Sequence, residues 1–122
     1  MTTLVAIFLI LHGLFHLWYV IVSLRLIEYK PWMGWSGESW LLTSRLGDAG
    51  AHTIAAVLYS LAAMGFVASG VGLLMEQQWF RPVLVGSVVV SLIATILFWA
   101  GKDSLMMFVE ILIIGVLIIA FI

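Results

Sequence analysis

Long apolar stretches separated by short polar segments dominate the chain. Four of them are long enough to cross a membrane, because a helix needs about 20 mostly apolar residues to span the hydrocarbon core. Their apolar residues run on without the alternation that is typical of barrel strands, which indicates helices. The pattern predicts four transmembrane helices, at about residues 3–24, 52–75, 82–100 and 104–122.

The connections between these spans differ in length. The first, residues 25–50, is the only long one and is rich in tryptophan. Tryptophan favours the headgroup zone, where its apolar ring and its polar edge are both satisfied. We therefore expect this loop at the membrane interface, with residues 38–46 forming a short interfacial helix or extending the second span backwards. The predicted interface anchors are Trp32, Trp35, Trp40 and Trp79.

The third connection, residues 101–103, is short enough to force the last two spans into an antiparallel hairpin. The chain is thus expected to form one all-α membrane domain over residues 1–122, an antiparallel bundle of four transmembrane helices. Ser87, Ser91 and Thr95 follow one another at steps of four residues on the third span. Stripes of small residues are typical of packed membrane helices, so this stripe predicts a packing face rather than a polar lane.

Composition places the protein in a membrane. The 122 residues are 65% hydrophobic and 9% charged, with a mean hydropathy of +1.26, whereas soluble domains are about 25% charged. A net charge of −1 gives no basic surface for nucleic acid. The absence of cysteine excludes disulfides, thiolate metal sites and covalent c-type haem.

Lysine and arginine are unevenly distributed between the two predicted membrane surfaces. Four lie in the first and third connections, and Arg81 alone lies on the other side. Because cytoplasmic loops carry an excess of Lys and Arg, the first side is predicted to be cytoplasmic, with both termini outside the cell. The four are Arg25, Lys30, Arg45 and Lys102.

Histidine and glutamate occur inside the predicted spans, where ionisable side chains are costly and mark functional candidates. His16 lies nine residues before Arg25, which places it about 13 Å below one membrane surface at a rise of about 1.5 Å per residue. Glu110 lies eight residues after Lys102, about 12 Å below the same surface. His12 lies one turn deeper than His16 on the same helix face.

A third predicted span also carries an ionisable residue at a similar depth. His52 lies seven residues after Arg45, at most about 10 Å below the same surface. Ionisable groups from three spans are thus predicted to share a depth, and a histidine beside a carboxylate lowers the cost of burying both. The predicted proton- or ligand-binding site comprises His12, His16, His52 and Glu110.

Several roles are compatible with these residues. As hydrogen-bond partners they would only link helices. A pair of histidines four residues apart can chelate a metal, with Glu110 and His52 as third and fourth ligands, as in mixed carboxylate and imidazole sites of helix bundles. A haem would need His52 opposite His12 or His16, because its two axial ligands must come from different helices.

Two functional classes follow from this pattern. The first is a non-enzymatic accessory subunit or homo-oligomer whose buried His/Glu site binds a proton, an ion or a small lipophilic ligand. Four short spans enclose little volume, and the chain carries no soluble-enzyme motif. The alternative is a membrane oxidoreductase or a metal- or haem-binding protein, and a further alternative is a small oligomeric transporter. The expected partners are the bilayer and other membrane subunits or copies.

Three segments carry a resemblance to known proteins. They read LHGLFH at residues 11–16, LYSLAAMGFVASGVGLL at residues 58–74 and WFRPVLVGSVVVSLIATILFW at residues 79–99. The chain resembles small four-span integral membrane proteins of bacteria and archaea, a group without an assigned function. The HG pair in the first span, the W-x-R-P start of the third and Glu110 midway along the fourth carry the likeness. The resemblance implies the four-helix fold and brings no activity, substrate or cofactor.

Overall fold

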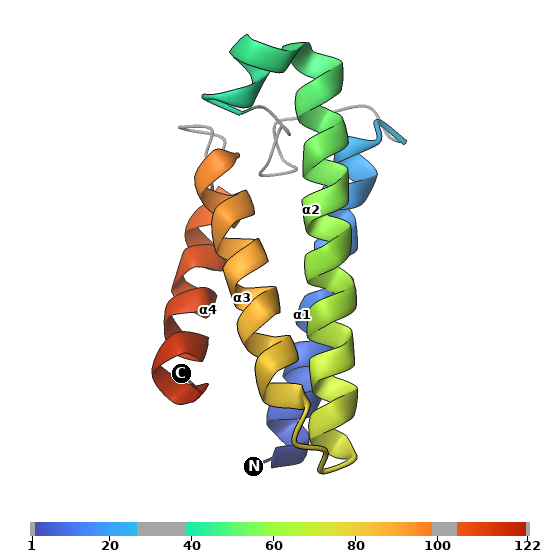
Figure 1. The fold of residues 1–122 in the computed structure, drawn as a ribbon, viewed down its shortest axis with the longest axis vertical. Helices are drawn as coiled ribbons and strands as arrows, with labels where there is room; N and C mark the ends of the chain where they lie inside the picture. The colour runs from blue at the N-terminus through green and yellow to red at the C-terminus, as the bar shows by residue number, and fades with distance from the viewer. Residues whose placement is uncertain (1, 27–38, 99–104, 122) are drawn as a thin grey trace.

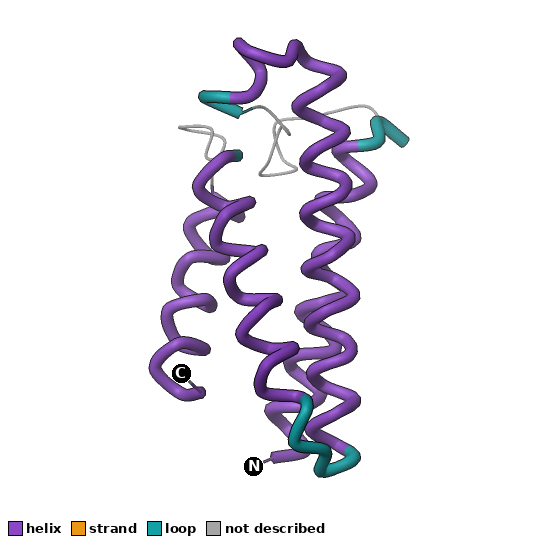
Figure 2. Tube along the Cα trace, viewed as in Figure 1, coloured by secondary structure: helices purple, strands orange, loops and turns teal. Residues whose placement is uncertain are grey.

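The computed structural model of the chain describes residues 2–26, 39–98 and 105–121. These residues form four helices, and the part of the chain so described contains no strand (Figures 1 and 2). The helices run alternately up and down, side by side, so the predicted antiparallel all-α bundle is confirmed (Figure 1). The helices are α1 (Thr2–Ser23), α2 (Leu42–Leu74), α3 (Phe80–Leu97) and α4 (Leu105–Phe121).

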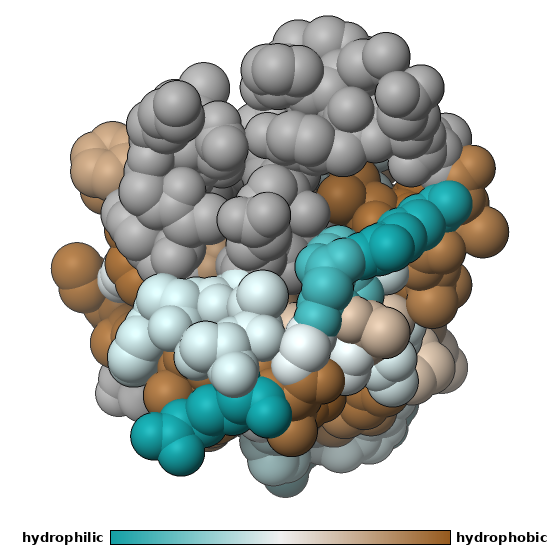
Figure 3. All heavy atoms as spheres, turned by 90° about the horizontal axis from the view of Figure 1, so that it is seen from above, coloured by the Kyte–Doolittle hydropathy of each residue, from teal (hydrophilic) through white to brown (hydrophobic). Residues whose placement is uncertain are grey.

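The outer surface of the bundle is apolar. α1, α2 and α3 are each long and apolar enough to cross a membrane, and α4 is a shorter apolar helix. Leucine, isoleucine and methionine side chains are exposed along the flanks, including Leu4, Leu11, Met64 and Ile119. Seen from the end where α2 begins, hydrophilic side chains gather on the end face while apolar ones project at the sides (Figure 3). An apolar surface of this kind is typical of a membrane protein.

α2 begins earlier than the second predicted span. It starts at Leu42, ten residues before the predicted start, and is bent at Gly47, whose φ of 76° and ψ of 172° are not helical. Glycine adopts positive φ at little cost, which permits the bend. Within residues 38–46, residues 42–46 form a short helical segment that the kink at Gly47 turns away from the axis of α2, so the straight span is not extended backwards (Figure 1).

The kink lies beside the end of α1. The Arg25 guanidinium forms an ion pair with the Asp48 carboxylate, one residue after Gly47. Both side chains are more than half exposed, and an exposed pair of this kind contributes little stability. The pair connects the end of α1 to the start of the straight part of α2.

Tryptophan side chains lie at both ends of the bundle. Trp40 is exposed and its indole Nε1 donates to the carbonyl of Ile96, 2.7 Å away near the end of α3. Trp79 lies at the opposite end, at the start of α3, where its ring packs against Gly72. These are the positions that interface anchors occupy. The other two predicted anchors, Trp32 and Trp35, lie outside the described residues, as does the predicted hairpin at residues 101–103.

α1 and α2 pack so closely that their backbones touch. A Cβ atom on Gly13 would lie 2.8 Å from the Ala63 carbonyl oxygen and 2.9 Å from the Val67 nitrogen. A Cβ atom on Gly70 would lie 2.7 Å from the carbonyl oxygen of Ala6. In a membrane, where apolar burial gives helices no reason to associate, such close approach is a main source of stability. This contact fixes the position of α1 in the bundle.

The glycine contact gives a direct test of this packing. Gly13→Ala is expected to lower the free energy of unfolding by about 1–3 kcal/mol, because the added methyl group must push α1 away from the α2 backbone. Gly86→Ala is the matched control, since a Cβ atom there meets nothing within 4 Å. The control should be neutral or stabilising by up to about 1 kcal/mol, because alanine favours helix over glycine. Thermal unfolding in micelles measures both; equal melting temperatures would contradict the packing.

Candidate functional site

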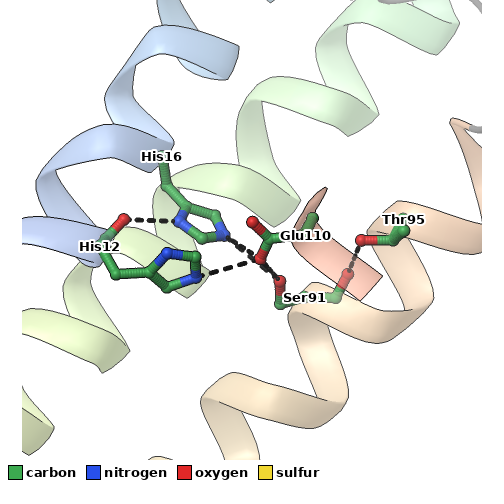
Figure 4. A network of polar contacts seen from close by, with 5 residues as sticks. All are labelled: His12, His16, Ser91, Thr95 and Glu110. Carbon is green, nitrogen blue, oxygen red and sulfur yellow. Dashed lines mark hydrogen bonds and ion pairs between the residues drawn. The ribbon is translucent and has the colours of Figure 1, made fainter. Parts of the chain in front are cut away.

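α1 supplies two imidazoles to the centre of the bundle. His12 and His16 are four residues apart, which places them on one face of the helix, one turn above the other. They are 5% and 0% exposed. Their ring centroids are 4.5 Å apart and the rings are nearly perpendicular. Both rings point towards Ser91 on α3 and Glu110 on α4 (Figure 4).

The carboxylate of Glu110 on α4 meets both imidazoles. Its Oε1 lies 3.1 Å from His12 Nε2 and 3.0 Å from His16 Nε2. Glu110 is 1% exposed. The predicted convergence of side chains from separate spans is therefore confirmed for these three residues, which we call the His/Glu cluster (Figure 4).

α3 adds a hydroxyl to the same oxygen. Ser91 Oγ donates to Glu110 Oε1 at 2.7 Å and lies 3.2 Å from His16 Nε2. One turn further along α3, the Thr95 hydroxyl donates to the Ser91 carbonyl at 2.7 Å. Glu110 Oε1 thus has three polar neighbours from two other helices. Ser91 is completely buried and serves the cluster rather than packing alone.

The hydrogen bond at the other ring nitrogen of His16 fixes its tautomer. His16 Nδ1 lies 2.8 Å from the backbone carbonyl of His12. A carbonyl oxygen only accepts, so Nδ1 carries the hydrogen. In a neutral imidazole the other nitrogen then has none, and Nε2 presents a lone pair to Glu110. The backbone of α1 therefore sets which atom of His16 faces the site.

Aromatic rings on α1 and α2 enclose the cluster. The Phe66 ring lies 4.8 Å from the His12 ring and 5.2 Å from the His16 ring, centroid to centroid. On the other side, Tyr59 and Tyr19 stack on one another at 4.4 Å and flank His16. All three of these rings are completely buried. The cluster therefore lies where the two apolar cores of the bundle meet, in a region of low polarity.

Among the described residues with charged side chains, Glu110 is the one that is buried. The other described residues with charged side chains are exposed and lie at the bundle ends: Arg25, Arg45, Asp48, Glu76 and Arg81. A carboxylate in the hydrocarbon region is expensive and is found paired or in a functional site. The imidazoles and the serine hydroxyl provide that pairing, and no described lysine or arginine does so.

His52 does not join the cluster, contrary to the prediction. Its Nδ1 lies 2.8 Å from the Asp48 carbonyl and 3.3 Å from the Asp48 carboxylate. The α2 ring that flanks His16 belongs to Tyr59, seven residues further on, so His52 lies about 10 Å nearer the bundle end. The predicted depth was wrong because it was counted from Arg45 along a straight helix, and the kink at Gly47 breaks that line.

This position of His52 removes two of the sequence-based alternatives. The group of histidine and acidic ligand atoms within reach of one metal ion contains His12, His16 and Glu110 among the described residues. His52 is therefore not available as a fourth ligand. It also does not face His12 or His16, so the bis-histidine haem arrangement is not formed.

The polar and aromatic neighbours of the cluster were not predicted as site residues. Ser91 and Thr95 were assigned to a packing stripe, and that interpretation holds for Ser87, which fills the space beside Gly65 on α2. Ser91 could have been found from its position on the stripe, since the stripe places one hydroxyl at the depth of Glu110. Nothing in the sequence separates Tyr59 and Phe66 from other core aromatics.

Comparison of the chain with protein-family models, with curated proteins and with solved structures found no match. The resemblance to small four-span membrane proteins of bacteria and archaea stays a prediction.

The serine contact can be tested against its neighbour one turn away. Ser91→Ala is expected to lower the free energy of unfolding by about 1–3 kcal/mol, because the buried Glu110 oxygen loses a donor. Ser87→Ala is the control, since the Ser87 hydroxyl donates to the Val83 carbonyl within its own helix. Its cost should be well under 1 kcal/mol. Chemical unfolding in micelles compares the two; an equal cost would show that Ser91 is a packing residue.

Proposed function

We propose that the protein is a non-enzymatic integral membrane protein that holds one cation, a proton or a metal ion, between the imidazoles of α1 and the carboxylate of α4. It would work as an accessory subunit of a membrane complex or as a homo-oligomer. The observation that carries this proposal is the contact between His16 Nε2 and Glu110 Oε1, 3.0 Å apart.

That contact needs a positive charge. His16 Nδ1 is committed to the His12 carbonyl, so a neutral His16 has only a lone pair at Nε2. The single hydrogen of the Ser91 hydroxyl is directed to Glu110 Oε1. An ionised Glu110 facing a neutral His16 would place two lone pairs against each other in a medium of low polarity. One proton shared by the pair, or one metal ion, turns this repulsion into attraction.

A cation fits the site better than a small lipophilic ligand. The three polar atoms around Glu110 Oε1 lie 2.7–3.1 Å away, which leaves no room for a molecule between them. The apolar grooves that involve α1 lie elsewhere. One runs along α1 and α2 beside Gly13 and Met64, and another along α1 and α4 beside Phe8 and Val116. The first groove contains small residues of the kind that contact a further membrane helix.

The proposal includes an orientation in the cell membrane. Arg25 follows α1 and Arg45 precedes the straight part of α2, at the end of the bundle opposite to both chain termini (Figure 1). Arg25 and Arg45 at this end, against Arg81 at the other, support a cytoplasmic location for this end and an outside location for both termini. Glu110 would then lie closer to the cytoplasmic headgroups than to the outer ones.

The protonation states of Glu110 and His16 in the metal-free protein test the cation proposal. After removal of metals with a chelator, the protein in lipid bilayers at neutral pH should keep one extra proton on the pair. Either Glu110 is a carboxylic acid, seen by infrared absorption, or His16 carries hydrogen on both nitrogens, seen by ¹⁵N NMR. Glu110→Gln removes its band and so identifies it.

Glu76→Gln provides the control, because Glu76 is exposed in the turn between α2 and α3 and its band should be that of an ionised carboxylate. An ionised Glu110 together with a His16 that carries hydrogen on Nδ1 alone and a His12 that carries a single hydrogen would overturn the proposal, since no cation would then occupy the site.

A further inference from the structure

The His/Glu cluster has the composition of a transition-metal site. Three ligand atoms, one each from His12, His16 and Glu110, lie within 4.8 Å of one another, and all three residues are buried. We propose that this cluster binds one divalent transition-metal ion of the zinc class. The inference rests on the proposed cation site and names the cation. Two imidazole nitrogens and one carboxylate oxygen suit zinc and its neighbours, whereas magnesium and calcium prefer oxygen ligands alone.

The spacing of the ligand atoms is close to what such an ion requires. Zinc binds histidine nitrogen and carboxylate oxygen at about 2.0–2.2 Å in tetrahedral geometry, which sets neighbouring ligand atoms about 3.3 Å apart. Glu110 Oε1 lies 3.0 and 3.1 Å from the two Nε2 atoms. Lengthening these two distances by a few tenths of an ångström would bring them to the tetrahedral value, and all three ligand atoms already lie within 4.8 Å of one another.

The groups behind the ligands are those that metal sites use. Metal-binding histidine almost always donates its other ring hydrogen to a carbonyl or carboxylate, which orients the ring and raises its basicity. His16 does this through Nδ1 to the His12 carbonyl at 2.8 Å. The carboxylate ligand is likewise held, because Ser91 donates to Glu110 at 2.7 Å. His16 therefore presents a ready lone pair without any rearrangement of α1.

The net charge of the metal-bound site and the low polarity around it predict what else binds with the ion. Two neutral imidazoles and one carboxylate carry a charge of −1, so a divalent ion leaves a charge of +1 inside the membrane. Three protein ligands leave a fourth tetrahedral position open. An anion in this position would make the site neutral, which the low polarity around Phe66 favours. We therefore expect the ion to bind together with one small anion.

The test uses untagged full-length protein in micelles, stripped with a chelator and then titrated with zinc or with cobalt as a spectroscopic probe. The expected result is one ion per chain, a cobalt spectrum typical of four-coordinate geometry and a melting temperature that rises with zinc but not with magnesium. Glu110→Gln and His12→Gln should each weaken zinc binding at least a hundredfold. Ser91→Ala should weaken it ten- to a hundredfold, because it frees the carboxylate ligand.

His52→Gln is the matched control, since it removes a buried histidine that lies outside the cluster, and it should leave zinc affinity unchanged. The stabilisation of the unaltered protein keeps the test valid if a cluster variant fails to fold. Absence of zinc uptake, or uptake that is equal in Glu110→Gln, would overturn the metal assignment. If the metal-free pair nevertheless holds its extra proton, the cation proposal survives without the metal; if it does not, both fail.

Discussion

A carboxylate inside a bilayer is tolerated only where donors or positive charge surround it, and the arrangement around Glu110 follows from that constraint. One carboxylate oxygen is contacted by two imidazoles and one hydroxyl, drawn from α1 and α3. Each of these groups would be costly to bury without a partner, and together they satisfy one another. The contact also specifies how the helices align, because a residue one position away on α4 would point about 100° away from these partners.

The remainder of the bundle holds these groups in place. Gly13 and Gly70 allow α1 to touch the backbone of α2, which fixes the helix that carries both histidines. Gly65 on α2 leaves room for Ser87 on α3, and Ser91, one turn further along α3, faces the cluster. Rings from α1 and α2 then surround the imidazoles. Apolar packing and polar contact thus support the same alignment, which is expected of a sequence that specifies one structure.

Much of this arrangement was predictable from the sequence because membrane helices are long and regular. A rise of about 1.5 Å per residue placed His16 and Glu110 at one depth, and the structure brings them together. The same count failed for His52, because Gly47 adopts a conformation that a hydrophobicity pattern does not reveal. The direction in which a side chain points around its helix was also not predicted by counting residues along the span. Depth alone could have marked Ser91 as a neighbour of Glu110, but nothing in the sequence distinguishes the enclosing Tyr59 and Phe66 from ordinary core residues.

The central claim is that imidazoles from α1 and the carboxyl group from α4 meet inside the membrane. Solid-state NMR in bilayers tests it directly by measuring ¹³C–¹⁵N dipolar coupling between the Glu110 carboxyl carbon and the histidine side-chain nitrogens. The account predicts strong coupling to His12 and His16, whose Nε2 atoms lie 3.1 and 3.0 Å from Glu110 Oε1, and none to His52. Coupling absent from both α1 histidines, or present for His52, would contradict it.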